Sequence, residues 1–82
     1  MHGLRSLELT DTTIGDAGVK ALSALPALSE LSLVRTPVTG ASVPVFLAMP
    51  ALTRLDVRGV KLARNAVRKL RRKRGLTVMS DR

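Results

Sequence analysis

Few side chains in this 82-residue chain are suited to catalysis. There is no cysteine, and the single histidine, His2, precedes the first apolar segment, where we expect it to face solvent. A thiol nucleophile, a His-dependent triad and a zinc site of several Cys or His ligands are therefore argued against. The three methionines do not make a metal site. We expect no enzyme activity, no cofactor, no metal and no small-molecule substrate.

Glu8 and Asp56 are the carboxylates that come nearest to an acid–base pair. Because their strands are two apart in the expected sheet, these carboxylates would lie two strand spacings, roughly 10 Å, from each other. The surface there is expected to be open, without an apolar pocket to shift a pKa. This pair therefore gives no support for general acid–base catalysis.

A basic run near the C-terminal end is the sharpest local feature. Residues 52–82 hold eleven basic and two acidic groups, a net of +9, whereas residues 1–51 carry −1, which together give the net charge of +8. On a helix whose Val67 and Leu70 face inward, arginines share the outer side. The candidate basic patch is Arg64, Arg68, Lys69, Arg71, Arg72, Lys73 and Arg74.

Two interpretations of the basic patch stay open. It can contact phosphates, as in nucleic acid or another polyanion, or an acidic protein surface. It can equally be a polar cap that keeps the end of a repeat array soluble. No aromatic residue is interleaved to stack on bases, so recognition of single strands is unsupported. Val67 and Leu70 alone offer too little apolar area for a membrane anchor, so no membrane contact is expected.

The elements that must position these residues follow from an internal repeat of 24 residues. The repeats are residues 4–27, 28–51 and 52–75, and a partial fourth covers 76–82. The first two are identical at nine of 24 positions, and the third keeps the apolar positions alone. Counting at this period places Met79 at the position of Leu7. We expect residues 1–82 to form a single domain.

Each repeat begins with a short strand and continues into a helix. In Ser6–Thr10 apolar and polar residues alternate, which predicts a strand with one buried face. Asp16 is expected to cap a helix over residues 17–25, which Pro26 ends. In the second repeat, Ser42 as a cap puts Pro44 in the first helical turn, so a shorter or more 3₁₀-like helix is expected there.

The repeats read L-x-x-L-x-L-x-x-T-x-[IV], with the apolar positions Leu4, Leu7, Leu9 and Ile14 in the first of them. This pattern resembles the leucine-rich repeat in its bacterial, 24-residue variety, over residues 4–79. The resemblance implies a ribonuclease-inhibitor-like, right-handed α/β solenoid with a short parallel sheet on the concave side and helices on the convex side. It also implies non-enzymatic binding of a protein partner.

In that solenoid the concave strand residues are the expected contact surface. Alternation places a mixed set of polar side chains there, in cross-strand rows that begin Ser6/Glu30/Arg54 and Glu8/Ser32/Asp56, so that Glu30 can pair with Arg54. The candidate protein-binding residues are Ser6, Glu8, Thr10, Glu30, Ser32, Val34, Arg54, Asp56 and Arg58. The face has no aromatic side chain, so it is equally interpretable as a solvated sheet with cross-strand pairs.

Three further expectations concern the threonine position of the repeats, the ends of the repeat array and the cellular location. The hydroxyls of Thr12 and Thr36 can hydrogen-bond to the backbone of the neighbouring turn. The third repeat has Val60 at this position, which has no hydroxyl, so this ladder of hydrogen bonds should end there. No capping segment precedes Leu4, and three repeats are near the minimum for a stable array, so we expect a fragment of a longer solenoid or a marginally stable short one. As an alternative function, the chain is a fragment of a larger multidomain protein. No secretory leader or membrane span is recognisable, which favours the cytoplasm.

Overall fold

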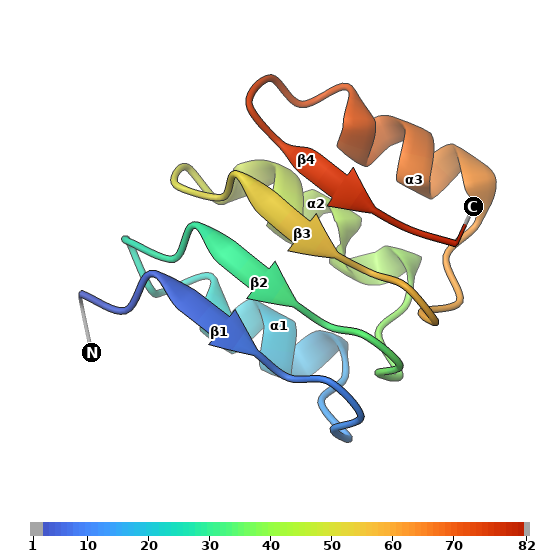
Figure 1. Ribbon diagram of the computed structural model, residues 1–82, viewed down its shortest axis with the longest axis horizontal. Helices are drawn as coiled ribbons and strands as arrows, with labels where there is room; N and C mark the ends of the chain where they lie inside the picture. The colour runs from blue at the N-terminus through green and yellow to red at the C-terminus, as the bar shows by residue number, and fades with distance from the viewer. Residues whose placement is uncertain (1–2, 82) are drawn as a thin grey trace.

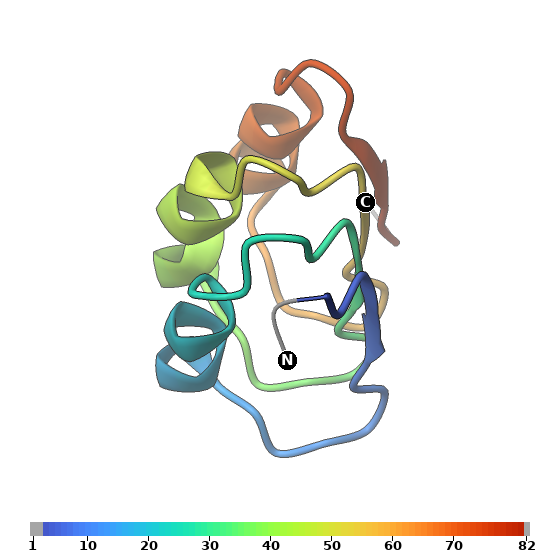
Figure 2. The same cartoon turned by 90° about the vertical axis from the view of Figure 1, so that its left-hand side faces the viewer.

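The computed structural model describes residues 3–81, so the expectation for His2 lies outside the described residues. These residues form an α/β fold of two layers (Figures 1 and 2). The strands are β1 (Ser6–Glu8), β2 (Glu30–Ser32), β3 (Arg54–Asp56) and β4 (Thr77–Met79). The helices are α1 (Asp16–Leu22), α2 (Val43–Ala48) and α3 (Arg64–Arg71), with a 3₁₀ turn, η1 (Gly40–Ser42), before α2.

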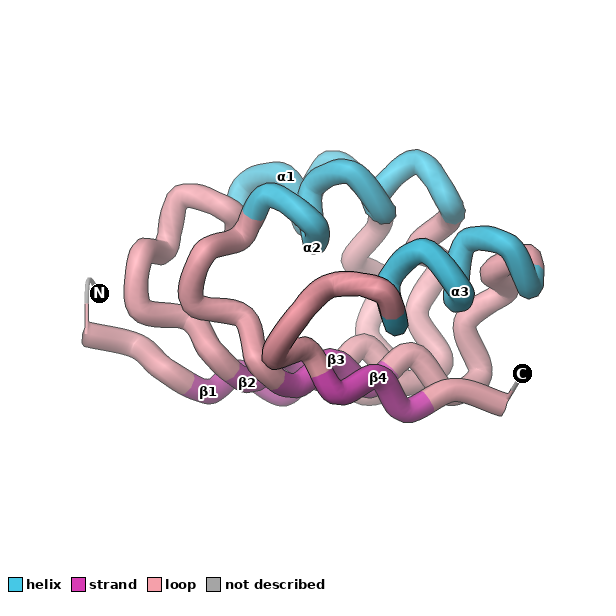
Figure 3. Tube along the Cα trace, turned by 90° about the horizontal axis from the view of Figure 1, so that it is seen from above, coloured by secondary structure: helices cyan, strands magenta, loops and turns pink. Residues whose placement is uncertain are grey.

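All four strands are parallel and follow one another in chain order, β1-β2-β3-β4. Each connection returns over the same side, so the helices form a row behind the sheet and leave its other face open (Figure 3). Leu7, Leu31 and Leu55 are register partners, as are the residues on either side of them. The predicted parallel sheet, its register across β1, β2 and β3, and the helical layer are therefore confirmed.

The core lies between the two layers and is densest in the middle and later units. Leu31, Leu33, Leu55 and Val57 are at most 2% exposed, as expected for the inward side of the strands. Leu7 and Leu9 are only partly buried, because within residues 3–81 the first unit has a neighbouring unit on one side only. The side chains predicted for the core therefore lie on the inward side of the strands, but those at the N-terminal edge are incompletely buried.

The first helix corrects the role predicted for Asp16. Gly15 occupies the N-cap position, Asp16 is the first helical residue, and the helix ends at Leu22 rather than at Leu25. The Asp16 carboxylate accepts hydrogen bonds from the Thr39 amide at 2.9 Å and from the hydroxyls of Thr39 and Ser42, both at 2.6 Å. Asp16 therefore ties its own helix to the turn of the next unit. These hydrogen bonds also lower the pKa of its carboxyl.

The second helix follows the expectation drawn from its proline. Ser42 is the residue before α2, and Pro44 lies in the first turn, where a missing N–H costs no helical hydrogen bond. The 3₁₀ turn η1 precedes it, and α2 has six residues against seven in α1. The Ser42 hydroxyl donates to Asp16 instead of capping α2.

The last strand corrects the predicted position of Met79. Register partners lie 24 residues apart between β1, β2 and β3, but only 23 apart between Arg54 and Thr77. Val78 therefore takes the inward position next to Leu55, and Met79 pairs with Asp56. Because side chains alternate between faces, this slip of one residue moves Met79 to the open face of the sheet.

The hydroxyl ladder also differs from expectation. Thr12 and Thr36 donate to the carbonyls of Leu9 and Leu33, each within its own turn, so they do not link units. Two other hydroxyls do link units. Ser29 donates to the Arg5 carbonyl at 3.1 Å, and Thr53 donates to the Ser29 carbonyl at 3.2 Å. These bonds lie just before the strands, where a polar side chain lies beside the neighbouring backbone.

Candidate functional site

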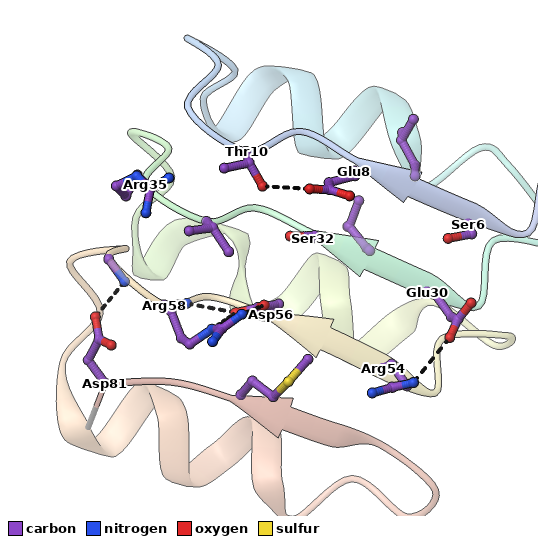
Figure 4. A pocket seen from close by; sticks show the side chains of 15 residues that line it. Ser6, Glu8, Thr10, Glu30, Ser32, Arg35, Arg54, Asp56, Arg58 and Asp81 are labelled. Carbon is purple, nitrogen blue, oxygen red and sulfur yellow. Dashed lines mark hydrogen bonds and ion pairs between the residues drawn. The ribbon is translucent and has the colours of Figure 1, made fainter.

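The open face of the sheet holds the candidate site. All nine residues predicted for it line one open hollow of about 750 Å³ that spans the four strands (Figure 4). They are Ser6, Glu8, Thr10, Glu30, Ser32, Val34, Arg54, Asp56 and Arg58. Ser6 and Glu8 are exposed, whereas Val34 and Asp56 are buried among their neighbours. The predicted set is thus brought together on one surface, which we call the sheet face.

An ion pair links the first two units at the edge of the sheet face. Arg35 donates through Nη2 to Asp11 Oδ2 at 2.7 Å and through Nε to Oδ1 at 2.5 Å. Both side chains are 60% exposed. These hydrogen bonds hold the pKa of the Asp11 carboxyl below its usual range and raise the pKa of Arg35. The bidentate geometry fixes the direction of the arginine although both groups stay in contact with water.

The backbone after each strand makes this pair possible. Asp11, Arg35 and Gly59 occupy equivalent places 24 residues apart and have φ of 60°, 55° and 74°. A Cβ on Gly59 would lie 2.7 Å from Cγ of Arg35. A glycine at 59 therefore leaves room for the arginine side chain, and it adopts the left-handed conformation without strain.

Asp56 and Arg58 form the most enclosed polar contact on the sheet face. Arg58 donates from Nη2 to Asp56 Oδ2 at 2.7 Å and from Nε to Oδ1 at 2.9 Å, and its amide donates to the same carboxylate. The Asp56 side chain is 8% exposed and that of Arg58 is 56% exposed. The hydrogen bonds from Arg58 lower the pKa of Asp56, against a smaller opposing effect of burial.

Two weaker contacts complete the face. Arg54 Nη1 lies 3.6 Å from Glu30 Oε2, which confirms the predicted cross-strand pair. Thr10 donates to Glu8 at 3.2 Å. Figure 4 shows these contacts arranged across the strands, so that carboxylates and guanidinium groups alternate over the surface. Exposed pairs of this kind add little stability but give the surface a defined pattern of charge.

Six residues that line the hollow lie outside the predicted set, and two of them are the strand leucines Leu7 and Leu31. Arg35, Gly59, Met79 and Asp81 all line it. Asp81 Oδ2 accepts a hydrogen bond from the Gly59 amide at 2.6 Å. The equivalent amides of Asp11 and Arg35 bond backbone carbonyls of the next unit. The Asp81 carboxylate therefore replaces a carbonyl at the end of the array. The 24-residue spacing was the available signal for Arg35 and Gly59.

The basic patch lies elsewhere, on the outer side of α3. Val67 and Leu70 are buried beneath it, as predicted. Arg64, Arg68 and Arg71 line a shallow depression of about 180 Å³ together with Val67. Lys69, Arg72 and Arg74 are also exposed. Arg72 occupies the C-cap position, so the basic run continues past the helix into the following turn.

Lys73 differs from the other members of the basic patch. Its ammonium donates to the carbonyls of Met49 at 2.5 Å and Phe46 at 3.0 Å, at the end of α2. The same carbonyls also accept from backbone amides, that of Phe46 from Met49 at 3.2 Å and that of Met49 from Leu52 at 3.4 Å. Lys73 adds a charged donor there, where the negative end of the helix dipole favours a cation. The side chain is partly buried, which lowers the pKa of Lys73. Its role is therefore to join α3 to α2.

Comparisons with known proteins give no family for this chain. Neither a scan against models of protein families nor a search of curated proteins found a match. Among residues 3–81, no three acidic, Cys or His side chains are placed to hold a metal ion. No helix in that part of the chain is long and apolar enough to cross a membrane.

Proposed function

We propose that the chain is a leucine-rich-repeat module of the solenoid type, without enzymatic activity, that binds a protein partner through the sheet face. The observation that carries the proposal is the gathering of all nine predicted residues around one hollow. The 24-residue spacing of register partners across β1, β2 and β3 supports the repeat. The proposal includes a cytoplasmic location, which suits a chain without disulfide-forming cysteines.

The packing of the sheet face supports binding without rearrangement. The Asp11–Arg35 and Glu30–Arg54 pairs each join neighbouring units, and Arg58 is held against Asp56. Side chains that are already oriented lose less conformational entropy when a partner docks. Alternating charges favour partners of complementary pattern over others. The hollow is open and mixed in polarity, which fits an irregular protein surface better than a small molecule.

Blocking the sheet face tests this proposal. Ser6→Tyr with Ser32→Tyr adds bulk at two positions of the hollow whose side chains face outward. The control is Ala17→Tyr with Ala21→Tyr, at exposed positions of α1. Proteins captured by the wild type should be retained by the control and lost by the sheet-face variant, with both variants folded by circular dichroism. Partners that bind all three alike would exclude the sheet face as the contact surface.

A further inference from the structure

The acidic residues of this basic chain are concentrated on the sheet face. The sequence holds six aspartates and glutamates against 14 lysines and arginines. Four of the six acidic residues, but three of the 14 basic ones, line the hollow. Asp11 is a fifth carboxylate at the edge of the sheet face, where it pairs with Arg35. Five carboxylates against three arginines give this surface a net charge of −2, although the chain as a whole carries +8.

Two of these carboxylates have no cation in contact. Each of the three arginines lies in an ion pair with another carboxylate of the same surface, and none of the ion pairs among residues 3–81 includes Glu8 or Asp81. Glu8 accepts a hydrogen bond from the Thr10 hydroxyl, and Asp81 accepts one from the Gly59 amide. Arg58 is within the electrostatic reach of Asp81 but forms its ion pair elsewhere. An ionised carboxylate has about four lone-pair positions, so both groups retain capacity for a further donor.

The floor of the hollow suits the stem of a long basic side chain. Ser6 and Ser32 are small side chains on the open face of β1 and β2, where they leave room between their neighbours (Figure 4). Val34 and Met79 add apolar surface, and Met79 reaches the hollow through the shift of register in β4. Lysine and arginine lay their methylene groups on apolar surface while the charged end reaches an acceptor.

The cations of the helical layer act weakly at this surface. The sheet and the helices are stacked along the shortest dimension of the molecule, which measures 17 Å (Figure 3). At an ionic strength of about 0.15 M the Debye length is about 8 Å, so charges across the core are largely screened. The carboxylates of the sheet face therefore determine the attraction that a partner meets there.

From these observations we propose that the sheet face binds a basic segment of a protein partner, whose lysine or arginine side chains reach Glu8 and Asp81. This proposal rests on the proposed function and adds the charge of the partner to it. Complementary charge selects such a segment over an acidic one, which would meet a net negative surface whose arginines are already paired.

A peptide titration followed by NMR tests the proposal. The probe is a short peptide in which lysine and serine alternate, added to the isotope-labelled full chain at about 0.15 M salt. It should shift the amide signals of β1, β2 and the Gly59 and Asp81 region more than those of α3. Peptides with glutamine or glutamate in place of lysine should bind the sheet face at least about threefold more weakly.

Removing the two carboxylates without a contacting cation should weaken binding. Glu8→Gln with Asp81→Asn should raise the Kd of the lysine peptide about three- to tenfold, since each exposed ion pair contributes modestly. The control is Ala17→Lys with Ala21→Lys, at exposed positions of α1, which raises the net charge by the same two units away from the hollow. The control should bind like the wild type, and equal weakening in both variants would overturn the proposal in favour of net charge. Circular dichroism confirms that each variant is folded.

The remaining outcomes separate this proposal from the proposed function. Equal binding of the lysine and glutamine peptides at the sheet face would contradict the charge of the partner and leave protein binding there intact. A lysine peptide that shifts only α3 signals, or none, would overturn the proposal, while the tyrosine variants still test the sheet face with other partners. Sheet-face signals that shift with protein concentration alone would identify a second copy of the chain as the occupant and contradict the proposal.

Discussion

The sheet face and the basic patch both contain several arginines, but the surroundings of these arginines differ. On the sheet face Arg35, Arg54 and Arg58 each lie against a carboxylate. On α3, Arg64 and Arg68 line a depression that contains no acidic side chain. The first surface is nearly neutral and patterned, and the second is uniformly positive. Arginine content alone therefore does not identify an electrostatic binding surface, because the nearest carboxylate decides the field.

The comparison also separates two kinds of partner. A patterned surface discriminates between proteins by the match of individual charges, whereas a uniform one attracts any polyanion and depends steeply on salt. The chain places these properties on opposite layers, with the core between them. Changes in the core should affect both surfaces, and changes in a single pair should affect one.

The largest expected effect is in the shared core. Leu31, at the centre of the sheet, is 2% exposed. Leu31→Ala should lower the free energy of unfolding by about 2–5 kcal/mol, because the cavity removes contacts that the neighbours cannot recover. Urea denaturation measures the change. Leu47, which is 38% exposed on α2, is the control, and Leu47→Ala should cost less than about 1 kcal/mol. Equal costs would contradict the two-layer packing.

A smaller loss is expected from breaking the enclosed pair of the sheet face. Asp56→Asn removes the charge that holds Arg58 and should cost about 1–3 kcal/mol of unfolding free energy by urea denaturation. Asp11→Asn breaks a pair of similar geometry, but both of its partners are 60% exposed, so its denaturation midpoint should move less. A larger shift for Asp11→Asn than for Asp56→Asn would mean that burial does not determine how much these ion pairs contribute to stability.

Low pH should lower the stability of the protein through the same carboxylate, that of Asp56. The hydrogen bonds from Arg58 lower the pKa of Asp56 in the folded chain, below the unfolded value of about 3.9. The resulting stabilisation is complete above that unfolded value and is lost as the pH falls through the folded one. Urea midpoints measured from pH 7 to pH 2 should therefore fall below about pH 4. The fall should be shallower in Asp56→Asn, and an unchanged acid profile would contradict the assignment.

The smallest expected effect is a difference in stability between substitutions of Lys73 and Arg74, which are neighbours in the basic run. Lys73→Gln should cost about 1 kcal/mol of unfolding free energy, since it leaves two carbonyls at the end of α2 without their charged donor. Arg74→Gln, at an exposed neighbouring position, should change stability by less than about 0.5 kcal/mol. Thermal or urea unfolding measures both.

Much of the architecture was predictable from local pattern. The alternation around Leu7 and its equivalents gave the strand positions, and the 24-residue spacing predicted which residues are register partners across β1, β2 and β3. The same alternation identified all nine predicted residues of the sheet face. The inward positions of Val67 and Leu70 followed from helical spacing. These features depend on periodicities of two and about 3.6 residues, which a single sequence displays directly.

Only the tertiary structure decided how the units meet. Five hydrogen bonds join residues 22 to 27 positions apart: Thr39 and Ser42 donate to Asp16, Gly59 donates to Asp81, and Lys73 donates to Phe46 and Met49. Their geometry depends on the stacking of whole units, which no local period encodes. The shift of Met79 to the open face has the same origin, because strand register is set by pairing with the neighbouring strand and not by counting along the chain.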